Sequence, residues 1–117
     1  MATKKATTRK PKEVFGRITV AQAKEKLAAG AAIVDIRPPG DWAGGHVPGA
    51  QNLPLVSVKG RAREIAPDVD VIFVDQNGEK SPQAAETAHS LEFKKVFIIE
   101  GGLDAWIKAG NELETIH

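Results

Sequence analysis

The chain has 117 residues, of which 42% are hydrophobic and 26% are charged, and its formal net charge at pH 7 is +1. This length is sufficient for one hydrophobic core and too short for two, and the composition is that of an ordinary globular domain. The sequence contains no cysteine, which excludes disulfides, thiolate metal ligands and thiol nucleophiles. It lacks the run of about 18 apolar residues that a membrane span requires and the features of a secretory signal, so we expect a cytoplasmic protein.

The basic residues are unevenly distributed along the chain. Five of the sixteen precede the first acidic residue, which leaves eleven basic against fifteen acidic residues in the remainder. We therefore expect a flexible basic tail over residues 1–14 and a mildly acidic folded domain over residues 15–117. A domain of this charge lacks the basic surface of a nucleic-acid-binding fold, and the three histidines show no metal-ligand spacing. We expect a monomer without a nucleic-acid partner, metal or other cofactor.

The first predicted elements are a short strand, a helix and a buried strand. Residues 17–18 favour the short strand. Thr19 and Gln22 have the spacing of a capping box at a helix start, and Gly30 is the residue at which we expect that helix to stop. The apolar run over residues 31–36 is typical of a strand that is buried on both faces, as in a parallel sheet.

The middle of the chain alternates between loops and short elements. Residues 40–53 are rich in glycine and proline and predict a loop, of which residues 51–53 form a short strand. Residues 54–64 predict a weak helix. The β-branched run over residues 70–74 predicts a second buried strand.

The last third of the chain repeats the alternation of helix and strand. Ser81 and Pro82 predict a helix start, with the serine as N-cap and the proline at the first helical position. Residues 96–99 predict a third strand, and residues 103–109 predict a final helix that ends at Gly110. Alternating strands and helices favour an α/β fold with a parallel sheet and helices on both faces.

Three segments of the chain occur in the order and spacing of known family motifs. They are Asp-Ile-Arg at 35–37 followed by Gly-His-Val-Pro-Gly-Ala at 45–50, a strand–loop–helix unit at 71–81, and Glu-Gly-Gly-Leu-Asp-Ala-Trp at 100–106. Together they resemble the rhodanese family, over about residues 17–110. The resemblance implies a three-layer α/β/α domain with a parallel sheet of about five strands.

The active-site loop departs from the pattern of this family. Members have Cys-x-x-Gly-x-Arg-Ser or a close variant, and transfer sulfur through a persulfide on that cysteine. Here the loop consists of Asp75, Gln76, Asn77, Gly78, Glu79, Lys80 and Ser81. A persulfide requires a soft thiolate, and a carboxylate forms no stable equivalent. Since the chain has no other cysteine, sulfurtransferase activity is chemically excluded.

Asp75 is the most informative position in this loop. In the family the loop amides and the start of the next helix form a positive cradle for an anion. We expect Asp75 to accept hydrogen bonds from those amides as a built-in anion, and Glu79 to add to the repulsion of anionic substrates. Alternatively, Asp75 is a nucleophile in a hydrolase or phosphatase. Such an enzyme normally needs further carboxylates, and Asp68 and Asp70 precede the strand and are therefore expected at its opposite end.

Several other polar and aromatic residues have structural roles in our interpretation. Asp35 and Arg37 are expected to tie a strand end to neighbouring loops, and His46 to bond backbone. Trp42 is expected mainly as a packing anchor, in a loop that borders the pocket. Glu92 stands where the family usually has glycine, so a left-handed backbone there is strained.

The sequence thus predicts a catalytically inactive rhodanese-like module rather than an enzyme. We expect it to bind a protein or a small anionic or polar ligand through the loop residues 75–81 and Trp42, as one domain of a larger protein. The hydrolase or phosphatase that uses Asp75 is the first alternative, and a purely structural domain is the second.

Overall fold

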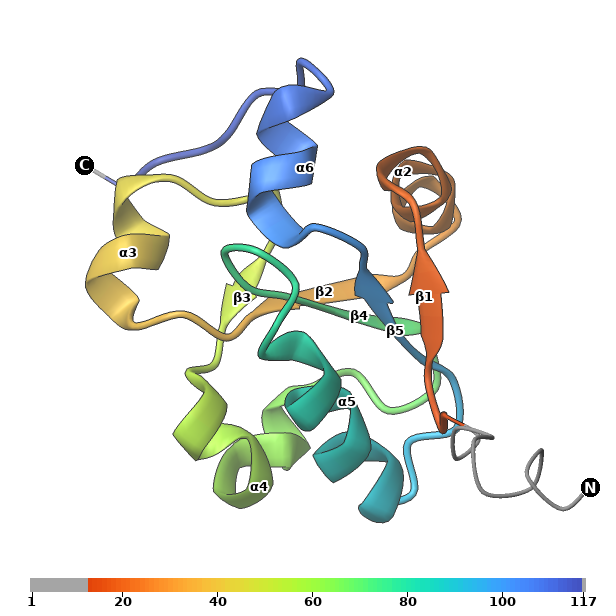
Figure 1. The fold of residues 1–117 in the computed structure, drawn as a ribbon. Helices are drawn as coiled ribbons and strands as arrows, with labels where there is room; N and C mark the ends of the chain where they lie inside the picture. The colour runs from red at the N-terminus through yellow and green to blue at the C-terminus, as the bar shows by residue number, and fades with distance from the viewer. Residues whose placement is uncertain (1–12, 117) are drawn as a thin grey trace, which may run out of the picture.

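Five parallel strands form the central sheet of the computed structural model, which describes residues 13–116 (Figure 1). Their order across the sheet is β1-β5-β4-β2-β3. The strands are β1 (Gly16–Ile18), β2 (Ala32–Asp35), β3 (Gln51–Asn52), β4 (Val71–Val74) and β5 (Val96–Ile99). The helices are α2 (Val20–Ala28), α3 (Pro39–Gly44), α4 (Val58–Arg61), α5 (Ser81–Ser90) and α6 (Gly102–Lys108).

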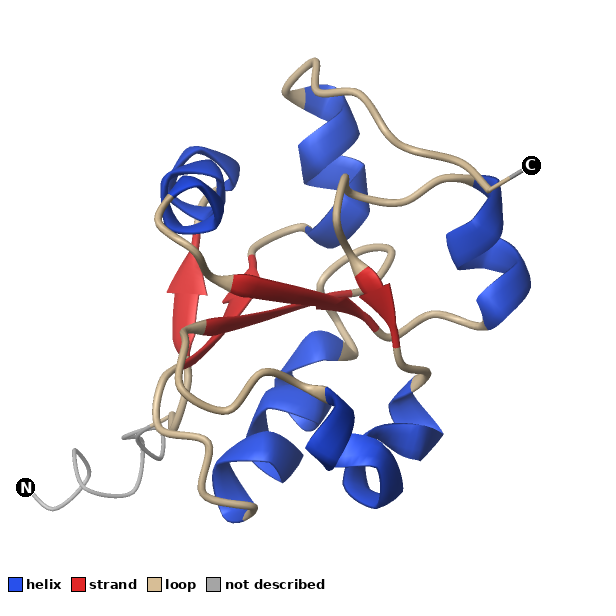
Figure 2. Cartoon of the chain, turned by 180° about the vertical axis from the view of Figure 1, so that it is seen from behind, coloured by secondary structure: helices blue, strands red, loops and turns tan. Residues whose placement is uncertain are grey.

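The helices cover both faces of this sheet, as the alternation along β4 shows. Val71 and Phe73 pack into the apolar cluster that includes residues of α4 and α5. Ile72 and Val74 pack into the second cluster, with residues of α2 and α6. Successive side chains of a strand point to opposite faces, so a strand buried on both faces must be apolar throughout. The three layers of helix, sheet and helix seen in Figure 2 confirm the predicted α/β/α fold.

The start of helix α2 confirms the predicted capping box. The N–H of Gln22 donates to the hydroxyl oxygen of Thr19, and the N–H of Thr19 donates to the Gln22 side-chain oxygen. Each bond satisfies a backbone donor that the helix itself leaves unpaired. Gly30 follows the end of this helix with a φ of 105°, as predicted for a left-handed stop.

Helix α5, like α2, is followed by a residue in the left-handed conformation, but here that residue is not a glycine. The N–H of Glu92 donates to the carbonyl of His89, and that of Phe93 donates to the carbonyl of Ala88, which is the pattern of a Schellman motif. Glu92 has a φ of 73°, the one positive φ outside glycine in residues 13–116. The left-handed backbone on which the predicted strain at Glu92 depends is thus confirmed, and a residue with a Cβ is unfavourable in this conformation.

The main error of the sequence prediction concerns residues 40–53. The sequence predicts a loop there, but the first residues of this stretch belong to helix α3. The carbonyl of Pro38 accepts the N–H groups of Asp41 and Trp42, and Pro39 occupies the first helical position. A proline is favourable there, because its missing N–H would be unpaired anyway. The sequence did not predict this helix because glycine disfavours the helical conformation.

Other boundaries differ less. The predicted helix over residues 54–64 is divided into α4 and two flanking 3₁₀ turns, Leu55–Ser57 and Ala62–Glu64. The predicted basic tail, residues 1–14, lies almost wholly outside the described residues. Within residues 13–116, none of the helices is both long and apolar enough to cross a membrane.

Candidate functional site

The loop between β4 and α5 closes around the side chain of Asp75. The N–H of Gly78 donates to Oδ1 at 2.8 Å, and the N–H of Lys80 donates to Oδ2 at 2.6 Å. The hydroxyl of Ser81 donates to Oδ1 at 2.6 Å. Asp75 is only 4% exposed. Both carboxylate oxygens are therefore occupied by donors of their own loop, which confirms the predicted hydrogen bonds from the loop amides.

Ser81 does not cap helix α5 as predicted. Lys80 is the residue before the helix, Ser81 is its first residue and Pro82 its second. The hydroxyl of Ser81 donates to Asp75 and forms no hydrogen bond with the helix N-terminus. Sequence reasoning placed the cap one residue too late because it assigned the serine hydroxyl to the nearest backbone and not to a carboxylate six residues earlier.

The loop is packed against Gly101 and the first turn of α6. The N–H of Leu103 donates to the carbonyl of Asp75 at 2.8 Å, and the N–H of Asp104 donates to the carbonyl of Gln76 at 2.9 Å. A Cβ atom at Gly78 would lie 2.9 Å from the backbone nitrogen of Gly101. The first turn of α6 thus holds the carbonyls of the loop, while Asp75 holds two of its amides.

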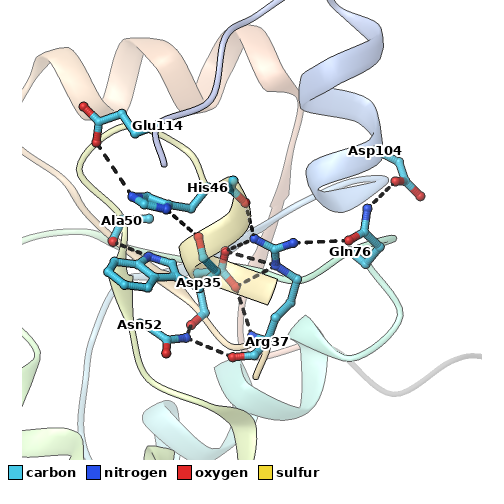
Figure 3. A network of polar contacts seen from close by, with 10 residues as sticks. Asp35, Arg37, His46, Ala50, Asn52, Gln76, Asp104 and Glu114 are labelled. Carbon is cyan, nitrogen blue, oxygen red and sulfur yellow. Dashed lines mark hydrogen bonds and ion pairs between the residues drawn. The ribbon is translucent and has the colours of Figure 1, made fainter. Parts of the chain in front are cut away.

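A chain of polar contacts joins the carboxyl end of β2 to this loop (Figure 3). Arg37 forms an ion pair with the buried Asp35, with 2.8 Å between Nη2 and Oδ2, and its Nη2 also donates to the carbonyl of Gly45. Its Nη1 donates to the side chain of Gln76, whose amide nitrogen donates to Asp104 at 2.6 Å. Asp35 and Arg37 therefore tie the strand end to loops, as predicted. Both the oxygen and the nitrogen of the Gln76 side-chain amide are therefore hydrogen-bonded.

Trp42 and His46 form a separate packing unit beside this network. Their rings stack with 4.3 Å between centroids, and the indole N–H of Trp42 donates to the carbonyl of Ala50. Nδ1 of His46 lies 2.6 Å from the carbonyl oxygen of Trp42, so this nitrogen carries a proton and donates. The backbone of His46 pairs with that of Glu114. These contacts confirm Trp42 as a packing anchor and His46 as a loop histidine bonded to backbone.

A cleft of about 520 Å³ lies over Asp75. The residues that line it come from three segments, within 36–41, 54–56 and 75–80. Its apolar lining includes Pro38, Pro54, Leu55 and Val56, and its polar lining includes Asp41, Gln76, Asn77 and Lys80. Val56 is 93% exposed, and Asp41 and Lys80 are exposed as well.

The structure brings together only part of the predicted site. Asp75, Gln76, Asn77 and Lys80 line the cleft, whereas Glu79 and Trp42 do not. Gly78 and Ser81 hold Asp75 from within the loop. Sequence reasoning missed the wall from residues 36–41 and 54–56, because these segments meet the loop only through the strand order. The local sequence also gives no indication that the hydrophobic side chain of Val56 is exposed.

The parallel sheet and a loop whose amides converge on the residue after β4 define the class of this protein as a rhodanese-like domain with a carboxylate at the cysteine position. The family model for the rhodanese-like domain matches residues 19–109. The chain belongs to this family, and it is a variant without the catalytic cysteine.

Two relatives and one solved structure illustrate the similarity. The chain is 37% identical over 92 residues to thiosulfate sulfurtransferase GlpE of Pseudomonas entomophila, covering 79% of this chain and 84% of that protein. It is 34% identical over 93 residues to the uncharacterized protein YqhL of Bacillus subtilis, covering 77% of this chain and 74% of that protein. The crystal structure of thiosulfate sulfurtransferase from Pseudomonas aeruginosa matches with a TM-score of 0.79 and 22% identity, over 88% of this chain and 21% of that one.

Proposed function

We propose that this domain is catalytically inactive and acts as a binding module, with the cleft over Asp75 as its contact surface. The observation that carries the proposal is the set of three hydrogen bonds on the Asp75 carboxylate. A cysteine persulfide cannot form on this chain, and the position from which sulfur would react holds a buried carboxylate that accepts three hydrogen bonds. What remains accessible is the lining of the cleft.

The bonds of Asp75 also bear on the chemistry of the ligand. An exogenous anion in the loop would compete with Asp75 for the N–H groups of Gly78 and Lys80, which already donate to that carboxylate. An anion beside Asp75 would in addition be repelled by its charge at low effective dielectric. A ligand of the proposed module therefore contacts the walls of the cleft and not the loop amides.

A hydrolase or phosphatase that uses Asp75 is not favoured by the same contacts. A carboxylate nucleophile attacks through a lone pair, and here donors on both oxygens compete for those lone pairs. Asp70 precedes β4 and bonds Lys26, while Asp75 follows β4. At about 3.3 Å per residue, these two carboxylates belong to ends of the strand about 16 Å apart.

We propose further that the domain works as one part of a larger protein. The match to the Pseudomonas aeruginosa thiosulfate sulfurtransferase supports this, because it spans only 21% of that chain. A domain of this fold thus occurs within a chain several times its own length. A binding module has an obvious use in such a setting, since it can bring another domain to its partner.

Two measurements test the proposed function. The first is thiosulfate:cyanide sulfurtransferase activity, for which we expect no turnover in the wild type. The matched variant Asp75→Cys restores a thiol at the end of β4 and reports whether the surrounding loop still supports the chemistry. Turnover in the wild type would refute the inactive assignment.

The second measurement locates a binding surface. In an isopropanol titration followed by ¹H–¹⁵N NMR, the amides of Leu55, Val56 and Lys80 are expected to shift together, because a small amphipathic solute occupies apolar clefts. Shifts spread evenly over the surface, with none concentrated at the cleft, would remove it as the contact surface.

A further inference from the structure

Several polar groups around the cleft are bonded within the protein. The loop amides of Gly78 and Lys80 donate to Asp75, and the guanidinium of Arg37 is engaged by Asp35, by the Gly45 carbonyl and by Gln76. A small polar ligand is recognised by a few convergent donors and acceptors. Here the Arg37 guanidinium and two of the loop amides are already engaged, so they are not available to such a ligand.

Two charged side chains of the lining differ from these groups. Asp41 lines the cleft from α3, and Lys80 lines it from the loop before α5. Both are exposed, and within residues 13–116 neither side chain forms an ion pair or a hydrogen bond. The two therefore present one negative and one positive group to a partner that lies in the cleft.

Residues 54–56 give the same cleft an aliphatic wall. Val56 is 93% exposed, and Leu55 and Pro54 beside it are half-buried. An apolar wall together with unpaired charges is typical of a protein–protein contact, in which the apolar part supplies most of the affinity and the charges set orientation.

We propose that the cleft binds an extended segment of a partner protein, which places one aliphatic side chain against Val56, an acidic residue near Lys80 and a basic residue near Asp41. This rests on the proposed function and names its partner class. The two opposite charges give the segment a direction, because the reversed sequence would bring like charges together at both ends.

The experiment is a selection of random decapeptides displayed on phage, with the full chain immobilised. We expect the enriched peptides to share an aliphatic residue with an acidic residue on one side and a basic residue on the other. Lys80→Glu is expected to replace the enriched acidic residue by lysine or arginine at the same place. Val56→Asp is expected to weaken binding of the best wild-type peptide at least about tenfold, as for a buried anchor.

Val69→Asp is the matched control. Val69 is 39% exposed and precedes β4, at the opposite end of that strand from Asp75, so this variant is expected to bind the peptide as the wild type does. Enrichment without an aliphatic preference, or an unchanged charge preference in Lys80→Glu, would overturn the inference. Sedimentation that shows a wild-type dimer lost in Val56→Asp would also overturn it, because the occupant would then be a second copy.

The two levels of the proposal fail separately. If isopropanol occupies the cleft but no peptide is enriched, the contact surface stands and the peptide partner is wrong. If isopropanol does not concentrate there, the proposed function itself loses its surface, whatever the selection yields.

Discussion

A methyl group added to Gly102 would lie 2.6 Å from the carbonyl oxygen of Asp75. The same carbonyl accepts the N–H of Leu103 at 2.8 Å, so helix α6 and the loop are in backbone-to-backbone contact here. Gly102 also has a φ of 60°, a conformation that favours glycine. The residue is therefore required both by its own backbone angle and by the closeness of the loop.

We expect Gly102→Ala to destabilise the domain by about 3 kcal/mol, since it combines a left-handed backbone with a clash against atoms that cannot rotate away. Gly110→Ala is the control. Gly110 has a φ of 89°, but an added Cβ there meets nothing within 4 Å, so only the conformational cost of about 1 kcal/mol applies. Urea unfolding of both variants measures the difference. Equal losses would show that the contact with Asp75 contributes little.

Removal of the Asp75 carboxylate should expose an anion site. We expect Asp75→Ala to lose about 2 kcal/mol or more of stability, because the N–H groups of Gly78 and Lys80 and the hydroxyl of Ser81 lose their acceptor. Sulfate should then bind the vacated amides and raise the melting temperature of the variant. Wild-type protein, and sodium chloride at equal ionic strength, serve as controls. A variant that responds to sulfate no more than the wild type would contradict the description of the loop as an anion cradle.

Relief of the strain at Glu92 should stabilise the protein. Because Glu92 has a φ of 73° at the end of α5, we expect Glu92→Gly to gain about 1 kcal/mol in the free energy of unfolding. Glu92→Ala removes the same carboxylate but keeps the Cβ, so it should give no such gain. The comparison by thermal and urea unfolding separates backbone strain from charge. A gain in both variants would assign the effect to the carboxylate.

Local features of the sequence predicted much of the fold. The Thr19 cap, the Gly30 stop and the buried strands depend on residues a few positions apart or on a continuous apolar run, and both are visible without tertiary structure. The acceptor role of Asp75 was also predictable, because its partners lie within the next six residues.

The features that sequence reasoning missed depend on distant parts of the chain. Val56 faces the cleft because β3 and β4 both flank β2, which places residues 54–56 beside the loop after β4. Helix α3 was hidden because its glycines disfavour a helix on their own. The Ser81 hydroxyl had two possible partners, the helix N-terminus and the Asp75 carboxylate, and only the folded loop decides between them.

The conformation of the loop is fixed by main-chain amides, by Asp75 and by Ser81. Glu79 and Lys80, by contrast, make no side-chain hydrogen bond or ion pair within the part of the chain that the structure describes. Substitutions at these two positions are therefore free to accumulate without loss of the fold. Under the proposed function, a single substitution at Lys80 would therefore change the partner that the cleft selects, while the buried carboxylate keeps the loop in the same shape.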